Sequence, residues 1–288
     1  MLRGAEKSKR GDAPGLDQIV SSRVKEVCVR NLFGLDINPF LVRTCQMNLV
    51  MHGDGSANVF QANSAWSPSE WDDPEASKRL KYNKADIVIT NPPFGGKAMT
   101  DDPHVLSRYQ LAAFDVKNVR NVLPAEQLFV EASLNFLRPG GILAIVLPDS
   151  ILNNPGLEFI RKWLLMRTRI IASVDLPKET FATSGGVPNP SVLIVQKLSQ
   201  AEAKISESGS LSNYDVFMAI PKTAGIDKRG NPVYKRSPEG FNVLDDTSEP
   251  IRNDEISLVA DAVFALDEPW ANWIRNKRKP VLKLRLSL

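Results

Sequence analysis

The sequence predicts an α/β protein with a mostly parallel sheet and helices on both faces of that sheet. Along residues 29–197, short apolar segments alternate with segments whose apolar residues recur every three to four positions. Strands that alternate with helices through short loops are typical of βα units, which build parallel sheets. The segment Ile142–Leu147 is almost wholly apolar, as expected for a strand buried on both faces.

The first segments predict a helix, a strand and a second helix. Leu16–Val27 has apolar residues at helical spacing, which predicts a short amphipathic helix. The run Val29–Leu35 predicts a strand that ends in Asp36. A proline fits a first helical turn and a glycine ends a helix, so we expect the second helix over Pro39–Met51, closed by Gly53.

The middle of the chain predicts two strands, a helix and the buried strand. Asn58–Ala62 is a short strand candidate, and Ala85–Thr90 (ADIVIT) is a stronger one. Ala125–Leu137 predicts a helix that Pro139-Gly140-Gly141 stops. The apolar strand Ile142–Leu147 follows directly.

The last part of the chain predicts one helix, two strands and a change of character. Gly156–Arg167 predicts the helix, and Ile170–Leu176 and Ser191–Lys197 predict the strands. Ser199–Ser212 is polar and rich in serine, which indicates a linker or surface loop. Asp215–Tyr234 predicts a hairpin because its turn contains Gly-Asn-Pro. We detect no internal repeat.

Composition excludes several classes of protein. The chain of 288 residues has 36 basic and 33 acidic residues and a net charge of +3, which permits nucleic-acid binding without demanding it. No apolar run is long enough to span a bilayer, and the N-terminus has no apolar core of a secretory signal. Cys28 and Cys45 form no C-x-x-C pair, and two histidines are few for a metal site. We therefore expect no membrane, no metal and a cytoplasmic location.

The segment Asn91-Pro92-Pro93-Phe94 carries the chemistry. It follows the strand Ala85–Thr90 at once, so it lies at the carboxyl end of a strand, where open α/β sheets bind ligands. Two consecutive prolines fix the backbone and remove two donors, which leaves a stiff turn with free carbonyl acceptors.

These four residues suit the binding of a planar ring that bears an exocyclic amino group. The side-chain oxygen of Asn91 and the carbonyl of Pro92 can accept the two amino hydrogens. Such acceptors favour a pyramidal nitrogen, whose lone pair is then free to act as a nucleophile. Phe94 offers a flat apolar face for stacking. A plain proline-rich turn with an asparagine cap is the alternative, and the position after a buried strand favours function.

The turn resembles the D/N/S-P-P-F/Y/W signature of amino-group methyltransferases that use S-adenosylmethionine. The wider match resembles adenine-N6-specific DNA methyltransferases, and especially the modification subunits of type I restriction–modification systems. The resemblance extends over about residues 27–197. It includes the following segments in order: Gly34–Pro39, Asn91–Gly95, Glu126–Phe129, Leu147–Ser150, Thr180-Phe181 and Gly185–Val187. It implies a Rossmann-like methyltransferase sheet and S-adenosylmethionine as the cofactor.

The resemblance also assigns roles to single residues. Asp36 would accept hydrogen bonds from the cofactor ribose, although an acid there could instead cap the following helix. Ile37 would line the cofactor adenine. Asn63 stands where the family usually has an acid that contacts the adenine amino group. Asn91, Pro92, Pro93 and Phe94 would be catalytic, and Asn91, Phe94 and Phe181 would bind the target base.

One family feature has no counterpart ahead of Asp36. The resembling enzymes begin with a strand and a glycine-rich loop at the cofactor, whereas residues 1–15 are polar and predict an irregular lead-in. In the resembling fold that strand lies between the strands that end at Asp36 and Thr90. We therefore expect a sheet that is incomplete at its N-terminal strand, with a gap or a changed pairing there.

The predicted domains are a partial catalytic domain over residues 16–198 and a C-terminal extension over residues 199–288, with a hairpin and a basic tail. The resemblance implies DNA as the substrate, a separate specificity subunit and a restriction subunit as partners. Two alternatives stay open. One is an RNA or protein-glutamine methyltransferase, since those also use an N-P-P-F/Y turn. The other is a non-catalytic methylase fragment.

Overall fold

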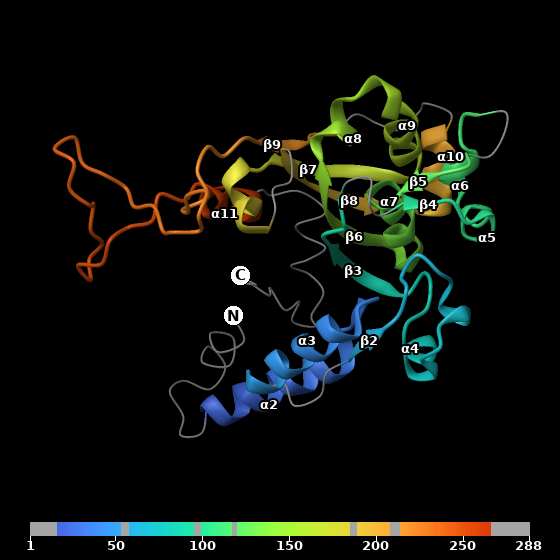
Figure 1. Cartoon of the computed structure of the whole chain (residues 1–288), viewed down its shortest axis with the longest axis horizontal. Helices are drawn as coiled ribbons and strands as arrows, with labels where there is room; N and C mark the ends of the chain where they lie inside the picture. Colours follow the sequence, from blue (N-terminus) through green and yellow to red (C-terminus); the bar gives the residue numbers. More distant parts are fainter. Residues whose placement is uncertain are drawn as a thin grey trace. The chain divides into compact units, whose positions relative to one another are not determined.

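The computed structural model of the chain describes residues 16–52, 58–94, 99–116, 120–184, 189–207 and 214–265. The chain divides into two compact units (Figure 1). Unit 1 comprises residues 1–80 and 266–288, and unit 2 comprises residues 81–265. The predicted lead-in over residues 1–15 and the predicted basic tail lie outside the described residues.

Unit 1 is built on a small parallel sheet of two strands. Its elements in chain order are α2 (Leu16–Asn31), β1 (Gly34–Asp36), α3 (Pro39–Met51), β2 (Val59–Gln61), η1 (Pro68–Glu70) and α4 (Pro74–Arg79). Strands β1 and β2 pair in register, with Asp36 opposite Gln61. Both strands therefore end at the same edge of this sheet.

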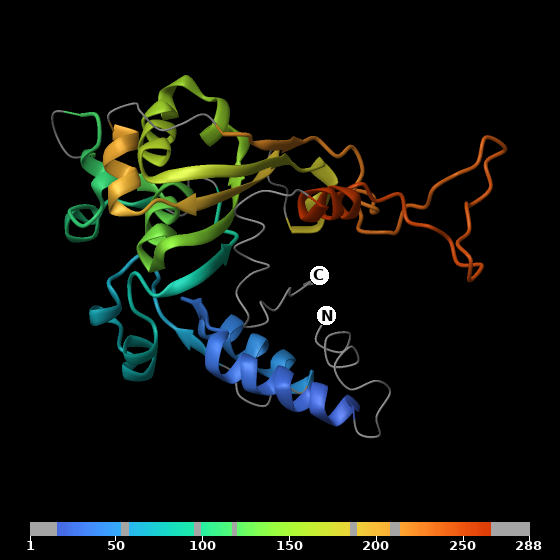
Figure 2. The same cartoon turned by 180° about the vertical axis from the view of Figure 1, so that it is seen from behind.

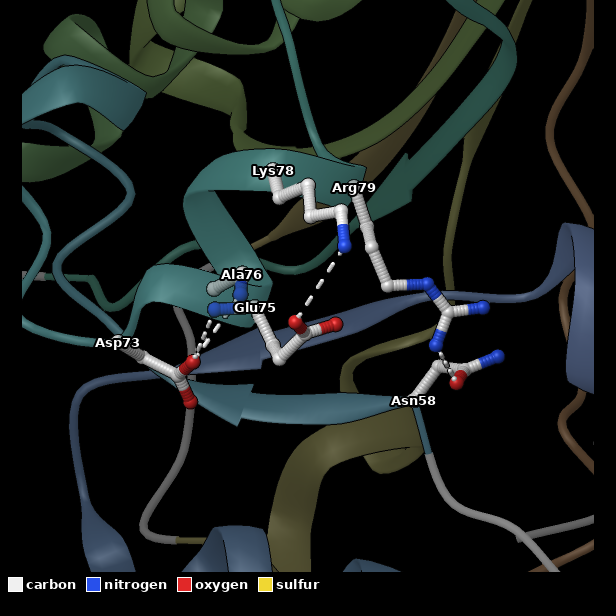
Figure 3. A network of polar contacts seen from close by, with 6 residues as sticks. All are labelled: Asn58, Asp73, Glu75, Ala76, Lys78 and Arg79. Atoms are coloured by element: carbon white, nitrogen blue, oxygen red, sulfur yellow. Dashed lines mark hydrogen bonds and ion pairs between the residues drawn. The ribbon is translucent and has the colours of Figure 1, made fainter.

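Asn58 joins three elements of unit 1 just before β2. Its buried side-chain amide donates to the carbonyl oxygens of Cys28, Val29 and Leu32 at 3.2, 2.6 and 3.2 Å. Cys28 and Val29 lie in the last turn of α2 and Leu32 follows it, where a helix needs partners from outside for its last carbonyl acceptors. Arg79, at the end of α4, donates to Asn58 Oδ1 and to Val29 O (Figure 3). The end of α2, the start of β2 and the end of α4 are thus tied together.

Unit 2 contains a mixed sheet of five strands. In spatial order these are β3 (Ala85–Thr90), β6 (Leu137–Pro148), β8 (Pro190–Lys197), β7 (Thr168–Asp175) and β9 (Phe217–Ala219). β3 is parallel to β6 and β9 is parallel to β7, whereas β8 is antiparallel to both of its neighbours. The prediction of a mostly parallel sheet is therefore wrong for its centre. A second pair, β4 (Met99–Thr100) and β5 (Leu123–Pro124), is antiparallel.

Helices and the sheet enclose one apolar core in unit 2. The helical elements are α5 (Pro103–Leu106), α6 (Gln110–Ala113), α7 (Ala125–Phe136), α8 (Asp149–Asn153), η2 (Pro155–Leu157), α9 (Glu158–Arg167), η3 (Lys178–Ser184), α10 (Gln200–Glu207) and α11 (Ile256–Ala265). Side chains from α6 to α9 meet those of β6 and β8 in this core. Alternate β6 residues Leu143, Ile145 and Leu147 are at most 1% exposed, as period-2 alternation requires.

A lysine closes the end of α7. Lys197 Nζ donates to the carbonyl oxygens of Leu134 and Leu137 and to Asn83 Oδ1, at 2.7–2.8 Å. All three ammonium hydrogens therefore have acceptors, and the positive charge lies at the negative end of the helix dipole. Burial lowers the pKa of Lys197.

A buried glutamate holds the start of α6. Glu131 on α7 is 3% exposed, and its carboxylate accepts the backbone N–H groups of Gln110 and Leu111 at 2.9 and 2.8 Å. These are first-turn amides that α6 itself cannot satisfy. Burial raises the pKa of Glu131, against the opposing effect of the two hydrogen bonds.

Several predicted elements are confirmed. Helix α3 and strand β3 have the predicted bounds, and α7 ends one residue early. The strand predicted over Val29–Leu35 is wrong in its first half, because α2 continues to Asn31. The predicted linker after Ser199 is also wrong in part, since α10 forms there.

The sheet is interrupted where the sequence predicts it. β1 and β3 belong to different sheets, and among the described residues β3 pairs with β6 alone. On β3, Ile87 is 39% exposed and Ile89 is 72% exposed. No helix among the described segments has the length and apolar character that a membrane crossing needs.

Candidate functional site

Two groups of residues stand out, one in each unit. The first lines a pocket of about 490 Å³ at the ends of β1 and β2 in unit 1. The second is the turn after β3 in unit 2. The predicted residues Ile37 and Asn63 both line the pocket, and Asp36 precedes Ile37 directly. The complete lining is Ile37, Gln61, Ala62, Asn63, Trp66, Glu70, Trp71, Asp72 and Asp73.

Asp36 is the last residue of β1, and one of its carboxylate oxygens is available. Its Oδ1 accepts the backbone N–H of Asn38 at 2.7 Å. Asn38 is the residue that caps α3, because its side chain accepts from Phe40 N at 2.9 Å. The capping alternative for Asp36 is therefore wrong. Within the described residues, Asp36 Oδ2 has no hydrogen-bond partner and can accept from a ligand.

The loop after β2 holds Asn63 in one conformation. Asn63 Oδ1 accepts from Ala65 N at 3.0 Å. Its main-chain oxygen accepts from Trp66 N and from Trp71 Nε1, both at 2.9 Å. The side-chain oxygen keeps one lone pair, and the amide nitrogen donates to none of the described residues. Asn63 can therefore present both a donor and an acceptor to a planar ring in the pocket.

Trp66 is a pocket residue that sequence reasoning missed. It is 41% exposed, whereas Trp71 is buried at 7% exposure and donates a hydrogen bond to Asn63 within the loop. Ile37, across the lining, is 64% exposed. An exposed aromatic ring and an exposed aliphatic side chain in one pocket can contact the faces of a flat ligand. The available signal was a large aromatic residue within an otherwise polar loop.

Two of the three acidic residues of the lining accept hydrogen bonds from nearby backbone N–H groups. Glu70 Oε2 accepts from Ser67 N at 3.1 Å. Asp73 caps α4 by accepting from Glu75 N and Ala76 N at 2.9 and 3.1 Å (Figure 3). Asp72 is exposed. The pocket therefore suits a ligand that is neutral or cationic.

In unit 2, the turn at Asn91–Phe94 presents alternate residues to solvent. Pro92 is less than 2% exposed, whereas Asn91 and Pro93 are exposed and Phe94 is partly buried. The preceding Thr90 pairs with Ile145 of β6, so the turn starts from a strand that is held in register. A buried proline thus anchors the turn and leaves the Asn91 side chain accessible.

The carboxyl ends of three strands share the edge at which Asn91 lies. β7 runs in the same direction as β3 and β6, because β8 is antiparallel to both β6 and β7. Phe181, in η3 after β7, therefore lies at the same edge as Asn91. β7 is three strands from β3, which is about 14 Å at the usual spacing. The structure places both residues at one edge, and the described residues record no contact between their side chains.

Glu126 is a second residue that the structure adds at this edge. Asn83, just before β3, donates its N–H to Asn135 O at the end of α7 at 2.8 Å, so the start of α7 lies toward the carboxyl end of β3. Glu126 is in that first turn, and within the described segments its buried Oε2 has no hydrogen-bond partner. Burial raises the pKa of Glu126.

Metal chemistry has no candidate ligands in the described part of the chain. No group of three or more histidine, cysteine, aspartate or glutamate side chains gathers there. The arrangement that is present is a pocket with ring-binding and hydroxyl-binding groups in one unit, and an amide–proline turn in the other.

Comparisons with known proteins agree with these features. The sequence model of the family described as N-6 DNA Methylase matches residues 17–218, well over half of the chain. The StySJI type I restriction enzyme methylase subunit of Salmonella typhimurium is 25% identical over 250 residues, which are 81% of this chain and 42% of that protein. The EcoKI methylase subunit of Escherichia coli (strain K12) is 26% identical over 232 residues, which are 74% of this chain and 39% of that protein. The chain spans about two fifths of the length of these relatives.

A solved structure shows the same fold. The type I restriction-modification system methyltransferase subunit from Streptococcus thermophilus matches with a TM-score of 0.51 and 18% identity, over 81% of this chain and 41% of that chain. The predicted fold class is thereby confirmed as the Rossmann-like α/β fold of S-adenosylmethionine-dependent methyltransferases.

Proposed function

Because the chain belongs to the N-6 DNA methylase family, we propose that it transfers a methyl group from S-adenosylmethionine to the N6 amino group of adenine in DNA. One observation carries this proposal. The Asn91 side chain is exposed at the carboxyl end of β3, on a turn that the buried Pro92 anchors. An adenine amino group has two hydrogens, and the exposed side-chain oxygen of Asn91 would accept one of them.

We assign the pocket of unit 1 to the methyl donor. S-adenosylmethionine supplies a methyl group on a positively charged sulfur. The volume of about 490 Å³ is in the range of small-molecule sites. Asp36 Oδ2 would accept a ribose hydroxyl. The adenine of the donor would contact Ile37 and Trp66 and form hydrogen bonds with Asn63.

At the acceptor, the residues of this chain would position the target amino group. Asn91 Oδ1 and the Pro92 carbonyl would accept its two hydrogens and hold the nitrogen lone pair free. A base that is stacked and paired inside a duplex cannot reach such a turn, so it would be flipped out. Phe94 would then stack on the flipped ring, and Phe181 would contribute a wall of the pocket. Catalysis of this kind rests on positioning, with no covalent enzyme intermediate.

We further propose that the protein acts as the modification subunit of a restriction–modification system, with a specificity subunit and a restriction subunit as partners. The named relatives are methylase subunits of type I restriction enzymes, which supports this assignment. Action on cellular DNA would place the protein in the cytoplasm.

The substitution Asn91→Ala tests the acceptor role. The side chain is exposed, so the variant should keep its circular dichroism spectrum and its affinity for S-adenosylmethionine but lose methylation of DNA. Wild-type protein, supplied with a specificity subunit and tritiated methyl donor, should yield N6-methyladenine. Full activity of the variant would refute the assignment. A methylated guanine or glutamine would instead indicate an RNA or protein substrate.

A non-catalytic role is the second candidate, and the interruption between β1 and β3 favours it. Calorimetric titration of the folded chain with S-adenosylmethionine separates the two. Micromolar binding supports the enzyme, whereas no binding by a folded chain supports the non-catalytic role.

A further inference from the structure

Residues 222–255, between β9 and α11, form an arm that leaves the sheet of unit 2 in both views (Figures 1 and 2). The family match ends at residue 218, so the arm lies beyond it. The sequence predicts a simple hairpin here. The turn at residues 227–231 is present, but the arm as a whole is branched.

Two rings of backbone hydrogen bonds build the branches. Each ring joins three residues, every one of which donates its N–H to the next. The first ring joins Gly225, Asn253 and Val233 at 2.8–3.0 Å, and the second joins Lys235, Ile251 and Val243 at 2.9 Å. Three hairpins emerge from these rings.

The three hairpins end in loops of the same conformation. They are loop 1 (Asp227–Asn231), loop 2 (Ser237–Phe241) and loop 3 (Asp245–Glu249), each closed by an N–H of its first residue to the carbonyl of its fifth at 2.9 Å. The fourth residues have positive φ: 85° at Gly230, 91° at Gly240 and 66° at Ser248. The expectation of no internal repeat is therefore wrong for the arm, because the repeat lies in the turn chemistry and not in apolar periodicity.

The loops are held by their own polar groups and not by an apolar core. Asp227 accepts from the side-chain amide of Asn231 at 3.0 Å and from Asn231 N and Arg229 N, both at 2.8 Å, and these bonds, the side-chain bond first, lower the pKa of its carboxyl. Asp245 accepts in the same way from Thr247 N and Glu249 N. Most arm side chains are exposed. The arm is thus a fixed scaffold that presents side chains to solvent.

Charge is divided unevenly over this scaffold. The exposed cations gather on loop 1 and on the strands beside the second ring, at Lys228, Arg229, Lys235, Arg236 and Arg252. Within the part of the chain that the structure describes, none of the five forms an ion pair with a carboxylate. Loop 3 carries the acidic residues Asp245, Asp246 and Glu249, and loop 2 carries the exposed Glu239.

We propose that loop 1 of the arm, through Lys228 and Arg229 at its tip, contacts the phosphate backbone of duplex DNA. The inference rests on the proposed function and adds a contact surface to it. Each of the two exposed cations on loop 1 can neutralise a phosphate and so release counterions on binding. Acidic loop 3 would face away from the polyanion, so the charge division also fixes the orientation of the arm.

The double variant Lys228→Gln/Arg229→Gln tests the contact. Binding of the whole chain to a fluorescein-labelled duplex is followed by anisotropy over a range of salt concentrations. Two lost phosphate contacts should raise Kd roughly tenfold or more at low salt and reduce the slope of log K against log salt by about 1.8. The matched control Lys25→Gln/Lys204→Gln removes the same charge from two exposed helix positions and should leave the slope unchanged.

Each outcome decides the inference. An equal loss of duplex affinity in the control variant would show an effect of net charge alone and would overturn the proposed contact. Unchanged binding in the Lys228/Arg229 variant would also overturn it and leave the arm to a protein partner. Methyl transfer by Asn91→Ala and the salt dependence of duplex binding by the Lys228/Arg229 variant are separate readouts, so failure of the catalytic assignment and failure of the arm contact give different patterns.

Discussion

The substitution Asp36→Asn isolates one charge beside the pocket that is proposed to bind the methyl donor. In the structure, Asp36 Oδ1 is occupied by the N–H of Asn38 at 2.7 Å, while Oδ2 has no partner among the described residues. An asparagine oxygen can retain the bond to Asn38. The amide nitrogen would then replace Oδ2 and present a donor where a ribose hydroxyl needs an acceptor. The variant therefore keeps the local turn and removes the proposed ribose contact.

The expected magnitude follows from that single contact. A hydrogen bond to a charged group contributes about 1.5–3 kcal/mol, which corresponds to a loss of roughly ten- to hundredfold in affinity. Asp36 is half-buried, so solvent competes for the carboxylate and the lower part of the range is expected. We predict a Kd for S-adenosylmethionine that rises about ten- to thirtyfold.

Isothermal titration calorimetry measures this directly, and Asn38→Ala is the matched control. Asn38→Ala removes the α3 cap, which costs about 1 kcal/mol of helix stability, but it leaves the Asp36 carboxylate in place. Its affinity should stay within about threefold of wild type. Wild-type affinity in Asp36→Asn would refute the ribose assignment, and equal losses in both variants would indicate a purely structural effect.

Three further predictions concern stability. Glu131→Gln should destabilise the protein. Because burial raises the folded-state pKa of Glu131 above its ordinary value, wild-type stability falls as pH rises from that ordinary value through the folded-state pKa. The difference in unfolding free energy between the two proteins in urea titrations should therefore narrow as pH rises above the usual glutamate range. Lys197→Met leaves three acceptors without their donor and should lower the unfolding free energy of unit 2 by about 2–3 kcal/mol, against less than about 0.5 kcal/mol for the exposed Lys204→Met. A constant gap, or equal effects of the two lysine variants, would contradict these predictions. Asn58→Asp loses three donated bonds and places a charge beside helix carbonyls, so hydrogen exchange at the end of α2 should accelerate; unchanged exchange would show that Asn58 is dispensable.

Elements with clear local signals could be predicted from the sequence. Pro39 and the 3.6-residue period define α3, and the alternation of ADIVIT defines β3. α10 was missed although Ser199 and Glu202 form the reciprocal capping pair that marks a helix start. The start of β6 was missed for another reason. Pro-Gly-Gly indicates a helix stop, yet Gly140, at φ 76°, carries the chain straight into the strand.

Some residues of the candidate site could likewise be predicted from the sequence, and others could not. The positions of Asn91 and Asp36 could be predicted, because Asn91 directly follows β3 and Asp36 is the last residue of β1, and the strand end fixes where such a residue lies. Trp66 could not, because its place in the pocket depends on a hydrogen bond from Trp71 to Asn63 that no local pattern reveals. The same holds for Glu126, whose burial follows from how α7 packs on the sheet. Contacts of this kind are decided by tertiary structure.

In unit 2, the strand that stabilises the fold is different from the segment to which the reaction is assigned. Strand β6 has a hydrogen-bonded neighbour on each side and contributes many residues to the core. Asn91, in contrast, is exposed beyond the end of β3, and among the described residues β3 has a hydrogen-bonded neighbour on one side. A substitution at Asn91 would therefore leave an intact molecule. Under the proposed function, in a cell that also makes the active protein, such a molecule would still occupy the DNA and the proposed partner subunits. Alleles of this type would act as dominant competitors of the wild type, and not as simple recessive losses.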